Sequence, residues 1–133
     1  MRFISFYRPG KEADTPPSRQ KMDALGRLID EMSQAGVLIA TDGLQSSSKG
    51  ARVQISGGMF SVSDGPFAET KELIAGYALI DAESKSEAVS WAKRFLSAMG
   101  EGECEVRQMD DGDPGHCIEK ETSDKHPSVV AKR

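Results

Sequence analysis

Apolar and polar residues follow one another along this chain with two different periods. Alternation with a period of two predicts strands, and apolar residues spaced three and four apart predict amphipathic helices. On this basis we predict strands over residues 2–7, 37–40, 51–55, 59–62, 76–81 and 103–109. We predict one helix from near residue 18 to residue 35 and a second from residue 85 to residue 99.

Both predicted helices carry end signals. The first begins near Ser18 and ends before Gly36, the residue type that most readily takes the left-handed conformation of a helix cap. The second begins with the capping box Ser84 to Glu87 and ends at Gly100. Their apolar stripes consist of Met22, Leu25, Leu28, Ile29 and Met32 in the first helix, and Ala88, Val89, Trp91, Ala92, Phe95, Leu96 and Met99 in the second.

The glycine pair at residues 57–58 predicts a two-residue hairpin turn. If these two residues form the turn, Ile55 pairs with Phe60 and Val53 pairs with Val62. This register places the apolar partners on one face of the hairpin, which supports the prediction.

The order of elements predicts an α+β fold of the ferredoxin-like βαββαβ type with an added β-hairpin. Helices on one face of such a sheet leave the other face open. The strands at residues 2–7 and 76–81 nevertheless carry apolar side chains on both faces. We therefore expect a second copy of the chain to cover the open face, giving a homodimer.

Residues 63–72 form the densest stretch of turn-forming and charged residues in the chain. Asp64, Gly65 and Pro66 favour a rigid turn, because Gly65 tolerates positive φ and Pro66 fixes φ. Phe67 follows as a large apolar anchor. Since strands are predicted on both sides, the stretch is a loop carried on a sheet, where functional groups are often found.

Asp64 is the first candidate for chemistry, and it has two interpretations. Its carboxylate can act as a general acid or base, or hold a ligand donor, at the mouth of a pocket. It can equally accept local backbone N–H bonds and define the bend, and turn chemistry alone accounts well for Asp-Gly-Pro.

Glu69 and Lys71 are two residues apart and share a face if the chain there is extended. With Asp64 they would form a charged group able to bind a polar ligand. The alternative is a solvated loop whose ion pairs contribute little. Lys49 and Arg52 can likewise meet an anion, or serve as ordinary solubilising charges, which we favour.

The run Asp64-Gly-Pro-Phe-Ala-Glu-Thr-Lys-Glu-Leu73 resembles the signature of the DGPF, or YCII-related, domain family. The resemblance continues through residues 35–38, 43–44, 49–53 and 74–77, and covers about residues 1–109. It implies a domain at 1–109 that forms a dimeric α+β barrel, as relatives do, while leaving residues 110–133 as a polar tail.

The resemblance implies little about a reaction, because the role of the family is largely unassigned. The YciI-like branch is thought to use a His and Asp pair around the first helix. Leu25 and Gln34 occupy the matching positions here, so that chemistry is not carried over. Both histidines, His116 and His126, fall in the tail.

Composition narrows the class of protein further. A chain of 133 residues with 38% hydrophobic and 29% charged residues fits one globular domain. The net charge of −4 argues against nucleic acid as a partner. No apolar run approaches the roughly 18–20 residues that span a bilayer, and no export signal is evident at the N-terminus. We therefore expect a cytoplasmic protein without nucleic-acid or membrane partners.

The two cysteines, Cys104 and Cys117, do not predict a cofactor or a metal site. Cys104, His116 and Cys117 match no zinc spacing, and we expect reduced thiols with Cys104 buried on its strand. No glycine-rich phosphate loop joins a strand to a helix. The sequence thus predicts no cofactor and no metal.

The function we expect is binding of a small polar molecule in a pocket near the Asp64 turn, with acid/base catalysis as a further step. Asp64 is the candidate catalytic residue, and Asp64, Phe67, Glu69 and Lys71 are the candidate ligand-binding residues. The alternative is a non-catalytic regulatory or protein-interaction module, since some relatives are linked to sigma-type transcription factors. Fold alone does not choose between them.

Overall fold

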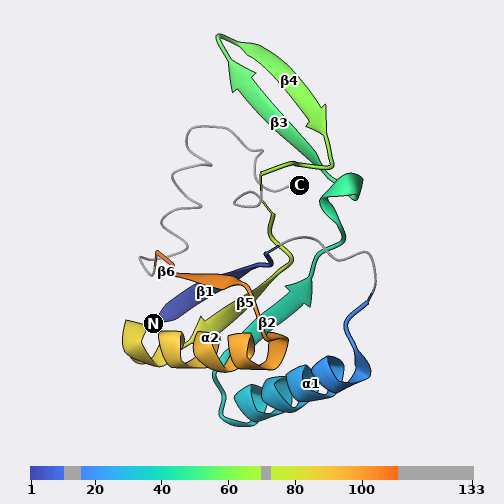
Figure 1. The fold of residues 1–133 in the computed structure, drawn as a ribbon. Helices are drawn as coiled ribbons and strands as arrows, with labels where there is room; N and C mark the ends of the chain where they lie inside the picture. The colour runs from blue at the N-terminus through green and yellow to red at the C-terminus, as the bar shows by residue number, and fades with distance from the viewer. Residues whose placement is uncertain (11–15, 70–72, 111–133) are drawn as a thin grey trace.

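The chain folds into a sheet with two helices on one face and a hairpin that projects beyond the sheet (Figure 1). The computed structural model describes residues 1–10, 16–69 and 73–110. Along the chain, the elements are β1 (Arg2–Arg8), α1 (Arg19–Gln34), β2 (Leu38–Gly43), the 3-10 helix η1 (Ser47–Lys49), β3 (Ala51–Ser56), β4 (Met59–Asp64), β5 (Gly76–Asp81), α2 (Lys85–Met99) and β6 (Glu103–Gln108).

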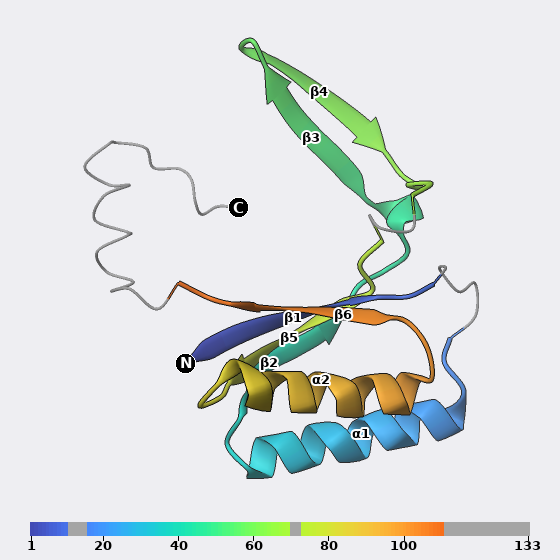
Figure 2. The same cartoon turned by 60° about the vertical axis from the view of Figure 1, so that its left-hand side comes forward.

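The main sheet has four antiparallel strands in the order β2-β5-β1-β6. Strands β3 and β4 form a separate two-stranded sheet, inserted between β2 and β5. Figure 2 shows this hairpin directed away from the side of the sheet that carries the helices. The predicted βαββαβ plan with an added hairpin is therefore confirmed.

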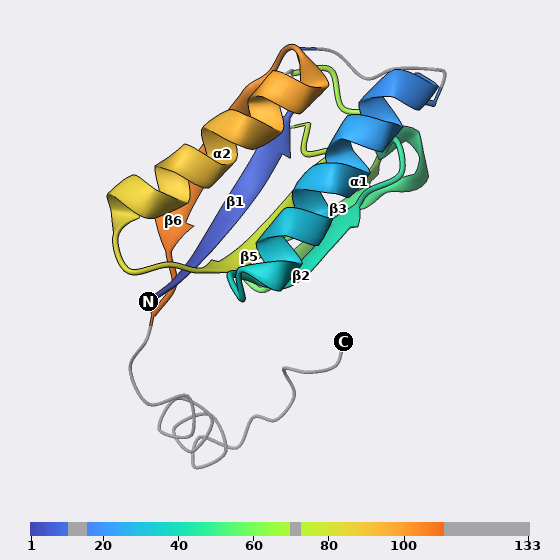
Figure 3. The same cartoon turned by 90° about the horizontal axis from the view of Figure 1, so that it is seen from below.

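Helices α1 and α2 lie side by side on one face of the main sheet (Figure 3). The burial of β1 follows from this arrangement. Phe3, Ser5 and Tyr7 are buried beneath the helices, whereas Ile4 and Phe6 on the other face are only half-buried. The predicted division of strand β1 into two faces is confirmed, and the second face is apolar and open.

The helix ends follow the predicted capping signals. Ser18 precedes α1 and its side chain accepts a hydrogen bond from the Lys21 N–H at 3.2 Å. At the start of α2, the Ser84 hydroxyl accepts the Glu87 N–H at 3.1 Å. The Glu87 carboxylate accepts the N–H of Glu83, one residue before the position that a standard capping box uses, at 2.8 Å.

The hairpin has the predicted register, in which Ile55 pairs with Phe60 and Val53 pairs with Val62. The glycines at 57 and 58 have φ values of +58° and +81°, as the turn requires. Some boundaries differ from the prediction: β2, predicted at 37–40, spans Leu38–Gly43. Strand β4 continues past Val62, so that Asp64 pairs with Ala51 as the last strand residue. The backbone ladder extends to that point because the following turn is fastened close to the start of β3.

The hydrophobic core gathers where the start of β1 and the end of β5 meet the helices. Its buried members are Phe3, Leu28, Met32, Val37, Ile80, Ala82 and Ala88. Trp91, predicted as core, packs against this cluster and is partly buried. Across the described residues, no helix combines the length and the apolar character that crossing a membrane requires. The predicted tail at 110–133 lies, apart from Asp110, outside the described residues.

Candidate functional site

The turn that follows β4 is held against the segment that precedes β3. The N–H of Gly65 donates to the carbonyl oxygen of Gly50 at 2.9 Å. A Cβ atom on Gly65 would lie 1.7 Å from the carbonyl oxygen of Ser47, so only glycine fits at this position. The Gly65–Pro66 peptide bond is cis.

Phe67 is fixed by contacts with the same preceding segment. Its backbone N–H donates to the Ser47 hydroxyl at 3.1 Å. The guanidinium of Arg52, on β3, stacks over the Phe67 ring at 3.8 Å from the ring centre. This distance is well within the range of a cation–π interaction. Phe67 therefore acts as the anchor that the sequence predicts, and Arg52 is engaged with it.

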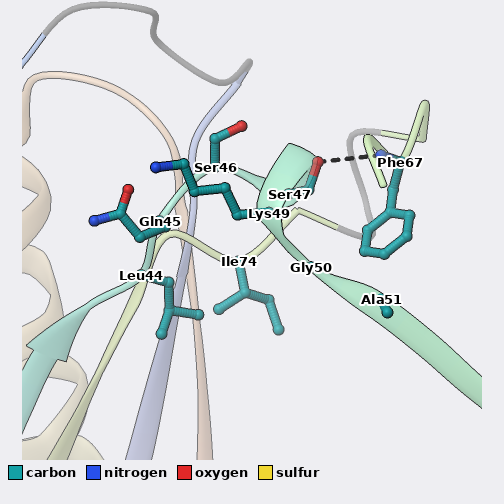
Figure 4. A pocket seen from close by; sticks show the side chains of 9 residues that line it. All are labelled: Leu44, Gln45, Ser46, Ser47, Lys49, Gly50, Ala51, Phe67 and Ile74. Atoms are coloured by element: carbon teal, nitrogen blue, oxygen red, sulfur yellow. Dashed lines mark hydrogen bonds between the residues drawn. The ribbon is translucent and has the colours of Figure 1, made fainter. Parts of the chain in front are cut away.

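These contacts frame a pocket of about 330 Å³, which we call the turn pocket. It is lined by Leu44, Gln45, Ser46, Ser47, Lys49, Gly50, Ala51, Phe67 and Ile74. Figure 4 shows the side chains of Leu44 and Ile74 along one side, with Phe67 at the other end of the pocket. The pocket thus combines an apolar side with polar groups.

The polar groups of the turn pocket come from the segment between β2 and β3. Among the described residues that line it, Lys49 is the one with a charged side chain, and Gln45 and Ser46 add an amide and a hydroxyl. An ammonium group donates up to three hydrogen bonds, and the amide both donates and accepts. This donor set suits a small molecule with carboxylate, carbonyl or hydroxyl oxygens.

Of the four predicted ligand-binding residues, the structure places Phe67 in the pocket lining but not Asp64 or Glu69. Phe67 lines the turn pocket, whereas Asp64 is exposed at the end of β4 and is not among the lining residues. Glu69 is exposed, and Lys71 lies outside the described residues. Phe67 and Lys49 thus line the same pocket, and the roles of Asp64, Glu69 and Lys71 stay predictions.

The turn at Asp64 is held chiefly by other groups. Among the described residues, no hydrogen bond to the Asp64 carboxylate is found, and the bonds that fasten the turn involve Gly65 and Phe67. The local hydrogen bonds expected of an Asp-capped turn are therefore not found within that part of the chain. The Asp64→Asn substitution tests whether the carboxylate takes part in ligand binding.

The described residues bring no group of three or more His, Cys, Asp or Glu side chains together for a metal ion. Cys104 is a free thiol on β6, and burial raises its pKa, although a hydrogen bond from Ser5 opposes the shift. His116, Cys117 and His126 lie outside the described residues.

Comparison with known families decides the kinship of the chain. A family model described as YCII-related domain matches residues 1–110. The chain belongs to the YCII-related family. The predicted membership of the YCII-related family is thereby confirmed.

Individual relatives of this YCII-related chain add little about function. An uncharacterized protein of Rhizobium meliloti (strain 1021) is 39% identical over 77 residues, which cover 57% of this chain. The chain spans 62% of the length of that relative, less than two thirds.

Among the solved structures that match, one has 15% sequence identity and a TM-score of 0.45. It is 5-chloro-2-hydroxyhydroquinone dehydrochlorinase from Burkholderia phenoliruptrix AC1100, in complex with 2,5-dihydroxybenzoquinone. The match covers 84% of this chain and 96% of that one. At this level of similarity, nothing about that enzyme's reaction is transferred to the YCII-related chain.

Sequence reasoning missed Ser47 as the residue that fastens the motif of this YCII-related chain. Ser47 lies in the polar run at 45–50, and this run predicts only a loop. The serine run does favour the cap of a short helix, because serine often precedes a helix. In the structure Ser46 takes this role and accepts the Ser48 N–H at 3.2 Å. Nothing in the sequence pairs Ser47 with Phe67, 20 residues away.

Proposed function

We propose that this YCII-related protein binds a small polar molecule in the turn pocket. The observation that supports the proposal is that Lys49 and Phe67 both line one pocket of about 330 Å³. A volume of this size lies within the range of small-molecule sites. Phe67 provides a fixed apolar wall, and the Lys49 ammonium provides a donor and a positive charge for the polar part of the ligand.

An acid/base step is the finer part of this proposal. Asp64 ends β4, one residue before the Gly65 turn, and it would supply the carboxylate that takes or gives a proton. Glu69 and Lys71 would assist it in binding the polar ligand. Phe67 lines the pocket. Asp64, Glu69 and Lys71 belong to the same short stretch of sequence as Phe67, and this supports the acid/base step.

The test starts with a screen of small carboxylic acids, amino acids and sugars by ligand-detected NMR. For a hit, the Kd is then measured with Lys49→Gln, Asp64→Asn and the control Arg27→Gln, which removes an exposed cation from α1. We expect about tenfold weaker binding for Lys49→Gln, since a charge-assisted hydrogen bond is lost. An unchanged Kd for Lys49→Gln contradicts the proposed pocket, and an unchanged Kd for Asp64→Asn removes Asp64 from the site.

We further propose a homodimer in the cytoplasm. Two observations support self-association: half-buried Ile4 and Phe6 on the open face of the sheet, and a hairpin whose apolar side chains are mostly exposed. Exposed apolar surface of this kind favours association. The unpaired thiol of Cys104 suits the reducing conditions of the cytoplasm.

The second candidate function is a non-catalytic interaction module. The observation that favours it is the same hairpin, where Met59 and Phe60 are 73% and 72% exposed. Deletion of residues 111–133 tests the role of the tail in such a module. Loss of a partner with an unchanged assembly state would support the module, and retained partner binding would exclude the tail from it.

A further inference from the structure

A second hollow, larger than the turn pocket, lies between the two helices and the main sheet. Its volume is about 970 Å³, and we call it the interlayer cavity. Its walls come from α1, α2 and the helix-facing side of the sheet, and include Leu25, Trp91 and Phe95. The hollow is partly open to solvent, because exposed residues such as Lys21 and Leu44 lie on its rim. A mostly apolar cleft of this size is within the usual range of small-molecule sites.

The cavity occupies the part of the interlayer space that the core leaves unfilled. The core is built around Phe3, at the start of β1, whereas Tyr7, at the end of the same strand, lines the cavity. The apolar stripe of α1 serves both regions, since Leu28 belongs to the core and also borders the cavity. The cavity walls are thus a continuation of the core surface, mostly aliphatic and aromatic.

Two hydroxyl groups in the cavity donate their protons to backbone carbonyl oxygens. The Tyr7 hydroxyl donates to the carbonyl oxygen of Glu101 at 2.9 Å, and the Thr41 hydroxyl donates to that of Tyr77 at 2.8 Å. A hydroxyl that donates its one proton still has oxygen lone pairs that accept. The polar groups of Tyr7 and Thr41 therefore present acceptors to a ligand.

Tyr7 is held firmly in this orientation. Its ring packs edge-on against Phe95, with ring centres 5.0 Å apart. Gly102, at φ +109°, also lies close to the Tyr7 ring, where a Cβ atom would come within 2.6 Å of a ring carbon. The acceptor on the Tyr7 oxygen is consequently preorganised, which lowers the cost of binding.

Two of the polar groups on the cavity wall, the Tyr7 hydroxyl and the Cys104 thiol, are uncharged at neutral pH, whereas the wall also includes the charged side chains of Lys21, Asp42 and Glu101. Burial raises the pKa of the Tyr7 hydroxyl, with the charge of Glu101 adding to the effect, and burial raises the pKa of the Cys104 thiol. Both groups thus stay protonated. The part of the wall that Leu25, Trp91 and Phe95 form is apolar, and it favours a neutral ring because burying an unpaired charge there is costly.

From this geometry we propose that the interlayer cavity is a second binding site, for a neutral apolar molecule that carries a hydroxyl group. Its ring or alicyclic body packs between Leu25, Trp91 and Phe95, and its hydroxyl donates to the Tyr7 oxygen. The proposal goes beyond the turn pocket, because it concerns a different cavity and a different class of ligand. The two hollows share Leu44, Gln45 and Ser46 as lining residues, so a ligand in one contacts a wall of the other.

The test compares 2-naphthol with 2-methoxynaphthalene, which has the same ring system but no hydroxyl proton to donate. Binding to the full chain is measured by ligand-detected NMR. We expect 2-naphthol to bind, and 2-methoxynaphthalene to bind about tenfold more weakly, because the hydrogen bond to Tyr7 is lost. The anion 2-naphthoate is expected to bind more weakly than 2-naphthol. Absence of 2-naphthol binding, or equal binding of the two neutral probes, overturns the proposal.

The site of binding is checked by the reactivity of Cys104, which lines the cavity. The chain has two cysteines, so the Cys117→Ser variant leaves Cys104 as its one thiol. We expect 2-naphthol to slow alkylation of Cys104 by N-ethylmaleimide in proportion to occupancy. An unchanged alkylation rate at saturating 2-naphthol overturns the assignment to this cavity.

A matched pair of variants on α1 separates the cavity from the surface. Leu25→Trp fills the cavity, whereas Met22→Trp adds the same side chain at a position that is 57% exposed. We expect Leu25→Trp to abolish 2-naphthol binding and Met22→Trp to keep it.

If Leu25→Trp does not fold, Tyr7→Phe replaces it and should remove the preference for 2-naphthol over 2-methoxynaphthalene. A preference retained in Tyr7→Phe overturns the proposed hydrogen bond. Lys49→Gln leaves this site intact, so the two proposals fail independently.

Discussion

The Ser47 hydroxyl accepts a hydrogen bond from the backbone N–H of Phe67 at 3.1 Å. This bond joins the short helix η1 to the turn after β4, across 20 residues of chain. Together with the bond from Gly65 to Gly50, it fixes the base of the projecting hairpin and one wall of the turn pocket. The architecture of the motif and the shape of the pocket therefore depend on the same contact.

Replacing Ser47 by alanine removes the acceptor for the Phe67 N–H. We expect the free energy of unfolding to fall by about 1 kcal/mol, the usual net value of one intramolecular hydrogen bond. Ser48→Ala is the control, because Ser48 is exposed and its hydroxyl lies 3.2 Å from that of Ser46, away from Phe67. Urea unfolding of both variants measures the difference. Equal stability of Ser47→Ala and wild type would contradict this role of Ser47.

Gly65→Ala and Gly26→Ala form a matched pair with opposite expected signs. At Gly65 a methyl group would meet the Ser47 carbonyl oxygen at 1.7 Å, so the turn must move and we expect a loss of about 2 kcal/mol or more. At Gly26, in the middle of α1, a methyl group meets nothing within 4 Å. There we expect a gain of about 0.5–1 kcal/mol, since alanine favours the helix. Thermal unfolding of the two variants decides, and a stable Gly65→Ala would disprove the close contact.

The ion pair between Glu31 and Arg94 links the two helices and predicts a pH dependence. The two terminal nitrogens of the Arg94 guanidinium each donate to a carboxylate oxygen of Glu31 at 2.6 Å. The hydrogen bonds from Arg94 lower the pKa of Glu31 below its ordinary value of 4.5. A carboxylate whose pKa is lowered on folding stabilises the folded state above the unfolded-state pKa, and this contribution is lost as the pH falls through the folded-state pKa.

The difference in unfolding free energy between wild type and Glu31→Gln should therefore be constant near neutral pH and shrink below about pH 4.5. Urea unfolding at a series of pH values measures it. Asp30→Asn removes the neighbouring carboxylate without disturbing the pair with Arg94, and serves as the control. A difference that persists unchanged to the lowest pH would show that Glu31 acts through packing and not through its charge.

Self-association through the hairpin is tested with Phe60→Ser and the control Met22→Ser. Phe60 and Met22 are both exposed apolar residues, at 72% and 57%, but only Phe60 lies on the projecting hairpin. We expect Phe60→Ser to weaken the proposed dimer about tenfold or more, because a large buried aromatic side chain often dominates an interface. Sedimentation velocity over a range of concentrations measures the dissociation constant. A dimer that tolerates Phe60→Ser leaves the open face of the sheet as the contact, and a monomeric wild type refutes the dimer.

Local sequence patterns determined most of the elements and their faces. The alternation in residues 2–7 identified Phe3, Ser5 and Tyr7 as one face of β1 because side chains alternate strictly along a strand. The hairpin register followed from two glycines and the requirement that apolar partners share a face. These features depend on residues close in sequence, so the sequence by itself sufficed. The continuation of β4 to Asp64 was missed because it depends on pairing with Ala51, which no local pattern shows.

Only the tertiary structure decided how the candidate sites are built. The motif at residues 64–67 was evident in the sequence, but its partners, Ser47 and Arg52, are distant residues whose side chains also fit an ordinary polar loop and strand edge. The interlayer cavity had no sequence signal at all. The same apolar stripes of α1 and α2 are compatible with a filled core or with a cleft between the layers. Which of the two forms is set by the packing of the whole domain and not by any one segment.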